Sequence, residues 1–146
     1  MFPLRHFHSF KIGGWILAAT LGGLIAPADA LAQTSADVPA TRSSNDQGVT
    51  VKVSPKLIGS TDKLWEFAVV LDSHSADLSD ELTQSASLTT SDGRTLQPVS
   101  WTGAPAGGHH REGVLAFEVP APRPSTIELR IARRGESAPR TFRWEL

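Results

Sequence analysis

The sequence predicts an all-β domain in which two antiparallel sheets pack face to face. From Gly48 onward, short segments alternate apolar and polar residues with a period of two, which places side chains on opposite faces of a strand. These segments recur about every 8 to 12 residues and are separated by Gly, Pro, Ser or Asp, as in antiparallel sandwiches. None has a convincing helical period. The chain contains no cysteine, so the domain is expected to be stable without disulfide bonds.

Seven segments are candidate strands, and together they indicate an immunoglobulin-like antiparallel sandwich. They span residues 49–53, 65–72, 87–90, 96–101, 114–119, 126–133 and 140–146. Each has one apolar face, as the last shows by placing Phe142, Trp144 and Leu146 on the same side. Residues 75–85 could form a short helical turn between the second and third strands.

The first 32 residues have the three-part order of a secretory signal peptide. Arg5 and Lys11 lie in an acid-free start, an uncharged run of 15 residues follows, and small residues precede two cleavage positions, after Ala30 or after Ala32. The position after Ala32 is favoured because the sequence turns polar there. An uncleaved membrane anchor is the alternative, but a spanning helix needs roughly 20 apolar residues. We therefore expect a periplasmic or secreted protein with no membrane span after cleavage.

The rest of the chain divides into a tether and one domain. Residues 33–47 lack a hydrophobic period and are typical of a disordered tether, whereas residues 48–146 form the predicted sandwich. Removing 32 of the 146 residues leaves 114, enough for one domain and too few for two. The formal net charge of −1 makes neither nucleic acid nor an anionic membrane an obvious partner.

Charges are unevenly distributed along the chain. Residues 57–93 contain seven acids and one base, whereas residues 94–146 contain eight arginines and five glutamates. In an antiparallel sandwich this distribution indicates opposite-sign pairs across neighbouring strands, each worth a few tenths to about 1 kcal/mol. The alternative interpretation is a polarised surface that recognises a partner.

Three histidines remain after the predicted cleavage, and all three fall in loops next to core strands. His74 follows the strand that ends at Asp72, and the pair His109-His110 precedes residues 114–119. Loops at one end of a sandwich are where such folds build their sites. Imidazoles with carboxylates suit copper or zinc, so the three histidines are candidate metal ligands. The carboxylates that could lie nearby are those of Asp72, Asp77, Asp80 and Glu112.

The same loops have two other interpretations. Loop histidines commonly hydrogen-bond to backbone groups and hold a turn. The loops could also contact a non-metal ligand or a partner protein, for which Asp72, Trp101 and Arg111 are the candidate binding residues. Trp101 lies at a strand–loop junction, from which its ring could line a pocket.

No catalytic motif stands out. Gly107-Gly108 lacks the strand–turn–helix context of a phosphate-binding loop, and no Gly-x-Ser-x-Gly element is present. We therefore predict a non-enzymatic binding or interaction module, with the histidine loops as its favoured site. The second hypothesis is a periplasmic copper- or zinc-binding protein. An enzyme ranks third because no nucleophile, base and orienting group can be assembled from these spacings.

Three blocks of sequence resemble a small uncharacterised family of exported bacterial β-sandwich domains. They are residues 65–75, residues 101–117 with a Gly-Gly-His-His-Arg loop, and residues 140–146 with a Phe-Arg-Trp-Glu-Leu strand. In that family the loop usually reads Pro-Pro-Gly-Gly-His-His, and Ala106 replaces the second proline here. The resemblance covers about residues 49–146. It implies one intact domain and adds weight to the three histidines as a set, but it implies no reaction.

Overall fold

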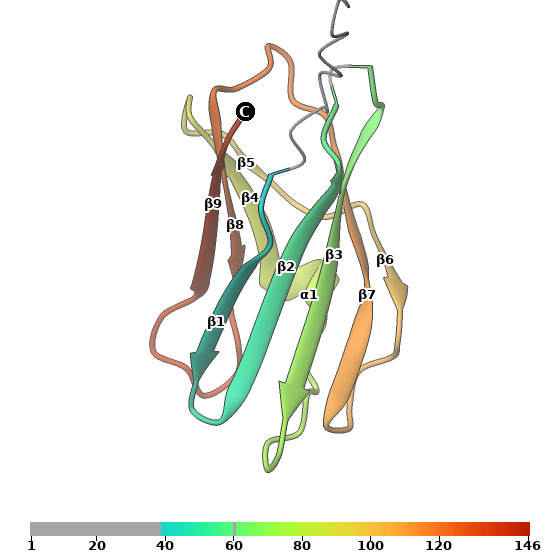
Figure 1. Ribbon diagram of the computed structural model, residues 1–146, viewed down its shortest axis with the longest axis vertical. Helices are drawn as coiled ribbons and strands as arrows, with labels where there is room; N and C mark the ends of the chain where they lie inside the picture. The colour runs from blue at the N-terminus through green and yellow to red at the C-terminus, as the bar shows by residue number, and fades with distance from the viewer. Residues whose placement is uncertain (1–38, 60) are drawn as a thin grey trace, which may run out of the picture. The chain divides into compact units, whose positions relative to one another are not determined.

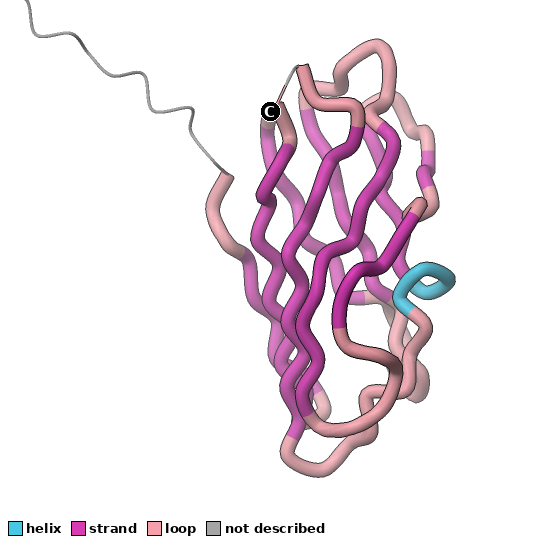
Figure 2. Tube along the Cα trace, turned by 90° about the vertical axis from the view of Figure 1, so that its right-hand side faces the viewer, coloured by secondary structure: helices cyan, strands magenta, loops and turns pink. Residues whose placement is uncertain are grey.

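The chain folds into two antiparallel β-sheets that form a sandwich, which confirms the predicted fold class (Figures 1 and 2). The computed structural model describes residues 39–59 and 61–146, so the predicted signal peptide and residues 33–38 of the predicted tether lie outside it. Within the described residues the single helix is α1 (Leu82–Ser85), which lies inside the segment expected to make a helical turn. No helix in these ranges is long and apolar enough to cross a membrane.

Nine strands make up the two sheets in the described part of the chain. The first sheet has the order β1 (Arg42–Asp46), β2 (Val49–Leu57), β3 (Leu64–Ser73), β7 (His110–Glu118), β6 (Ser100–Gly103). The second has the order β5 (Thr95–Leu96), β4 (Ala86–Thr90), β8 (Thr126–Ile131), β9 (Arg140–Glu145). Every neighbouring pair is antiparallel.

The connectivity of β2 to β9 is that of an immunoglobulin-like sandwich. The neighbours β2, β3, β7 and β6 occupy the places of strands A, B, E and D in one sheet. The neighbours β4, β8 and β9 occupy the places of C, F and G in the other, with β5 added beyond C. Strand β1 is therefore an extra edge strand outside the immunoglobulin-like set.

Strand β1 lies where the sequence predicted a disordered tether, so the folded domain begins earlier than expected. It pairs with β2 through a two-residue turn in which Gln47 and Gly48 both have positive φ, at 47° and 72°. This is the turn geometry that matches the twist of a hairpin. The polar sequence of β1 hid the strand, because an exposed edge strand needs no apolar face.

The predicted strand over residues 96–101 is divided between the two sheets. Its first part is β5, which pairs with β4, and its second part is β6, which pairs with β7. Pro98 lies between them and has no N–H to donate to a ladder, so continuous pairing ends there. The N–H of Val99 already donates to Ala116 in the first sheet, at 2.8 Å.

The alternating apolar residues of both sheets meet in one core. Trp65, Phe67 and Phe117 are fully buried, and Phe67 contacts Phe117 edge-on with ring centroids 5.8 Å apart. Phe67 also packs against Trp144 of the opposite sheet, at 5.6 Å between centroids. Aromatic contacts of this kind join the sheets near β9.

A chain of buried charges closes one end of this core. We call it the buried charge chain, and its members are Asp80, Arg133, Glu136 and Arg140. Their side chains are about 5% exposed or less, and the successive ion pairs measure 3.0, 3.2 and 2.6 Å. Buried charges are tolerated when they are paired and hydrogen-bonded in this way.

Arg140 connects the buried charge chain to the β1–β2 hairpin. Its guanidinium donates to the carbonyl oxygens of Asp46 and Val49, at 2.8 and 3.0 Å, and to that of Ser44 at 3.2 Å. Arg140 starts β9 in the second sheet, whereas the hairpin belongs to the first. Its side chain therefore ties the two sheets together at the edge where β1 and β9 lie side by side (Figure 1).

Replacing Glu136 with glutamine should lower the free energy of unfolding by about 3–5 kcal/mol, because Arg133 and Arg140 would keep buried charges without their carboxylate. Urea denaturation measures this change. Glu128→Gln is the matched control, since Glu128 pairs with Arg130 on the surface and should contribute about 1 kcal/mol or less. Equal effects of the two substitutions would contradict the structural role given to Glu136.

The hydrogen bond from Arg140 holds the pKa of Glu136 below its ordinary value, and the nearby charges of Arg140 and Arg133 act in the same direction. The stability that this carboxylate supplies is therefore present above its unfolded-state pKa and is lost as pH falls through the lowered one.

Candidate functional site

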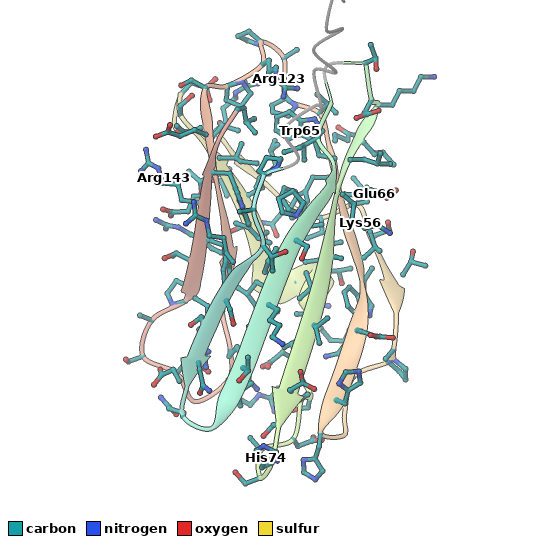
Figure 3. The ribbon with its side chains drawn as sticks, in the orientation of Figure 1. Lys56, Trp65, Glu66, His74, Arg123 and Arg143 are labelled. Carbon is teal, nitrogen blue, oxygen red and sulfur yellow. The ribbon has the colours of Figure 1, made fainter. Side chains whose placement is uncertain are left out.

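The loops that carry the histidines lie at one end of the sandwich, which we call the histidine end. They are residues 74–81, after β3, and residues 104–109, before β7, and Figure 3 shows His74 at this end. Backbone hydrogen bonds join the two loops. Leu78 donates to Gly108 O at 2.9 Å, Gly107 donates to Leu78 O at 2.9 Å, and Ser73 donates to His109 O at 2.8 Å. Gly107 and Gly108 both have positive φ, which this tight path requires.

The histidine side chains do not converge on a common point. His109 Nδ1 lies 3.2 Å from Ala76 O, whereas His110 Nδ1 lies 2.5 Å from Asp72 Oδ1. Within residues 39–59 and 61–146, no group of three or more His, Cys, Asp or Glu side chains is placed to hold a metal ion. The structure therefore gives no support to a copper or zinc site at His74, His109 and His110.

Two of the predicted carboxylates have structural partners. Asp77 Oδ1 accepts from the N–H of Gly108 at 2.8 Å, so it holds the glycine turn. Asp80 is 8% exposed, and its carboxylate accepts from Arg133 and from the N–H of Arg134. Asp80 is thus part of the buried charge chain and has buried partners of its own.

His110 forms an exposed charge cluster on the outer face of the first sheet. It is opposite Asp72 in the register of β3 with β7, and Nε2 lies 3.8 Å from Glu112 Oε2. The hydrogen bond to Asp72 raises the pKa of His110, with both carboxylates adding to the effect. Both carboxylates thus favour the protonated form of the imidazole.

Arg111, one of the candidate ligand-binding residues, is buried in the structure. It is 1% exposed, and its Nη1 donates to Leu78 O and Asp80 O at 2.9 and 2.7 Å. Its guanidinium also lies over the ring of Trp101, 5.7 Å from the centroid. Arg111 therefore anchors the loop after β3.

Trp101 is half-buried and packs where β6 and β7 approach closely. Its Nε1 donates to Ala104 O at 2.8 Å, and its ring lies across the paired glycines Gly103 and Gly113. A Cβ atom at Gly113 would lie 2.7 Å from the Trp101 ring and from the Gly103 backbone. The ring is therefore held by the fold, with its polar atom already bonded.

A separate groove runs between the edge strands β1 and β9. Its volume is about 540 Å³, and it is lined by Arg42, Ser43, Thr141, Phe142, Arg143, Trp144 and Glu145. Trp144 Nε1 donates to Ala40 O at 2.7 Å, so β9 is tied at this point to the segment that leads into β1. The groove therefore lies between the two sheets at an edge of each.

The free side of β9 faces away from its partner β8. Leu146 N donates to Ser125 O at 2.9 Å, and the register of β9 with β8 has no bulge. Because an antiparallel ladder alternates, the N–H and C=O groups of Thr141, Arg143 and Glu145 point to the open edge. Such groups can pair with an added strand.

The groove was not predicted from the sequence, because β1 was not recognised as a strand.

The sequence did contain one signal that the buried arginines point inward. Arg111 and Arg140 have the same parity as the apolar residues of β7 and β9, and Arg133 continues the parity of β8 two residues beyond its end. Alternation therefore places each of them inward. An arginine at such a position needs buried partners.

In an NMR titration, His110 should show a pKa above 6.5, and Asp72→Asn should move it back toward that value. Folding stability linked to His110 should be fully present below pH 6.5 and be lost as pH rises through the raised value. Asp77→Asn is the control, because Asp77 bonds to Gly108 and not to the imidazole. No difference between the two variants would contradict the proposed pairing.

Gly113→Ala should destabilise the domain by about 1–3 kcal/mol, since the new methyl group overpacks against the Gly103 backbone and Trp101. Urea unfolding followed by tryptophan fluorescence measures the change. A loss within about 0.5 kcal/mol, typical of a tolerant surface position, would show that the strands can separate to admit a Cβ atom.

Comparisons of the chain with protein-family models, curated protein sequences and solved structures found no match. The family resemblance of the three sequence blocks therefore stays a prediction. The fold and the two surfaces described above are the basis for inferring a function.

Proposed function

We propose that the chain is an exported, non-enzymatic interaction module that binds an extended segment of a partner protein at the free edge of β9. The observation that carries this proposal is the groove between β1 and β9, bordered by main-chain groups of β9 that have no strand partner in the described part of the chain. Strand addition uses such groups for affinity and nearby side chains for specificity.

The rigidity of the groove favours binding. Arg140 bonds to the β1–β2 hairpin at one end of β9, and Trp144 bonds to Ala40 toward the other. Phe142 and Trp144 are each 2% exposed and fix β9 in the core. A preformed groove lowers the entropy that a partner must lose on binding.

The histidine end is the less favoured surface. Its loops are joined by backbone hydrogen bonds and by Arg111, so their side chains have structural partners. The metal-handling hypothesis is not carried forward, because no observation in the described residues favours a metal site. Export rests on the predicted signal peptide.

A neutral peptide tests strand addition without relying on charge. The probe is a peptide of alternating threonine and valine with an acetylated N-terminus and an amidated C-terminus. It is titrated into the isotope-labelled protein, which is expressed as the full chain from Met1. We expect NMR shift changes and slower amide exchange at Thr141, Arg143 and Glu145, whose N–H groups face the open edge.

Two N-methylated versions of this peptide provide a matched control that leaves the protein unaltered. An added strand uses only one of its two edges, so methylating one alternate set of amides should abolish binding and methylating the other should not. Equal binding of both versions, or shift changes confined to the histidine end, would refute the proposal.

A further inference from the structure

Two arginines face the β1–β9 groove without a carboxylate partner. Arg42 and Arg143 both line the groove and are exposed, and neither forms an ion pair with another residue in the described ranges. Glu128 is directly opposite Arg143 in the register of β8 with β9, yet its carboxylate pairs with Arg130 at 2.7 Å. The positive charge of Arg143 is thus left for another acid.

Arg143 also borders a second hollow, on the outer face of the second sheet. This hollow has a volume of about 460 Å³, and most of its other lining residues carry hydroxyl groups or charges. Figure 3 shows Arg143 on the outer side of β9. The guanidinium can therefore reach a group that lies along the free edge of β9 and on the outer face of the sheet.

A strand added to β9 would place alternate side chains on that same outer face, beside Arg143. Opposite charges at such cross-strand positions attract, and an arginine can hold a carboxylate through two parallel hydrogen bonds. Glu145 lies on the same wall and would repel an acid next to it. The charges thus favour an acid beside Arg143 and a neutral or basic residue beside Glu145, which fixes the register of the added segment.

We propose that the segment bound at this edge is acidic and extended, with a carboxylate facing Arg143. This inference rests on the proposed strand addition and specifies the chemistry of the partner. An extended segment fits because the groove follows the main chain of β9 from residue 141 to residue 145.

The test compares three peptides of one length on the full chain. They are the neutral threonine–valine peptide, a version with glutamate in place of one central threonine, and a version with lysine at that position. At low salt the glutamate peptide should bind more tightly than the neutral one, by about two- to fivefold for each charge pair formed. Added salt should reduce the difference.

Arg143→Glu should reverse the preference, so that the lysine peptide binds more tightly than the glutamate peptide. Arg134→Glu is the matched control, because Arg134 is exposed and lies outside the groove, and the substitution changes the net charge by the same amount. The control should keep the preference for glutamate. A reversal in the control as well would show a non-specific charge effect and overturn the inference.

The remaining outcomes separate this inference from the proposed function. Equal affinity for all three peptides would refute an acidic partner and leave strand addition intact, whereas no binding of any peptide would refute both. Amides of Thr141 and Arg143 that are already protected without peptide would mean that the edge is occupied by the chain's own N-terminal residues or by a second copy. If this amide protection is lost when the protein is diluted, the occupant is a second copy. Either occupant would overturn the inference.

Discussion

The contact between the β1–β2 hairpin and β9 depends on one set of interactions, the buried charge chain of Asp80, Arg133, Glu136 and Arg140. Its charges alternate in sign, so each arginine lies against at least one carboxylate. It joins the loop after β3, the β8–β9 loop and the start of β9, and Arg140 extends it to the β1–β2 hairpin. Arg111 reaches the same end from β7 by bonding to Asp80 O. The chain has no cysteine and closes its core here with ion pairs and backbone hydrogen bonds, whereas many exported domains rely on disulfides.

This arrangement explains why the two surfaces differ in what they offer a partner. At the histidine end, backbone groups bond to one another, and the side chains of Asp77, Asp80 and Arg111 hold the loops. At the β1–β9 side, inward side chains make the connections, and no strand of residues 39–59 or 61–146 pairs with the outward edge of β9. An exposed edge strand is a hazard unless it is protected. Here Arg143 and Glu145 place charges along it, which oppose uncontrolled pairing with another strand.

The sequence predicted the elements with strong alternation and missed those without it. Phe142, Trp144 and their counterparts in the other strands identified the core faces, because burial imposes a period of two. Strand β1 carries no such signal, and the division of residues 96–101 depends on Pro98 and on which sheet each half joins. The pairing of His110 with Asp72 spans 38 residues and follows from the register of β3 with β7, which no local pattern encodes. The alternation of residues along the strands shows that these arginines point inward. It does not show which loop residues pair with them.

The central claim is that the buried charge chain holds β1 and β9 together and so maintains the groove. Native-state hydrogen exchange of the unsubstituted chain and of Glu136→Gln tests this claim most directly, because it resolves the stability of each strand. The account predicts that amides of β1 lose protection far more than those of β3 and β7, as the hairpin detaches from β9 while the core persists. A uniform loss across all strands, or unchanged protection of β1, would contradict it.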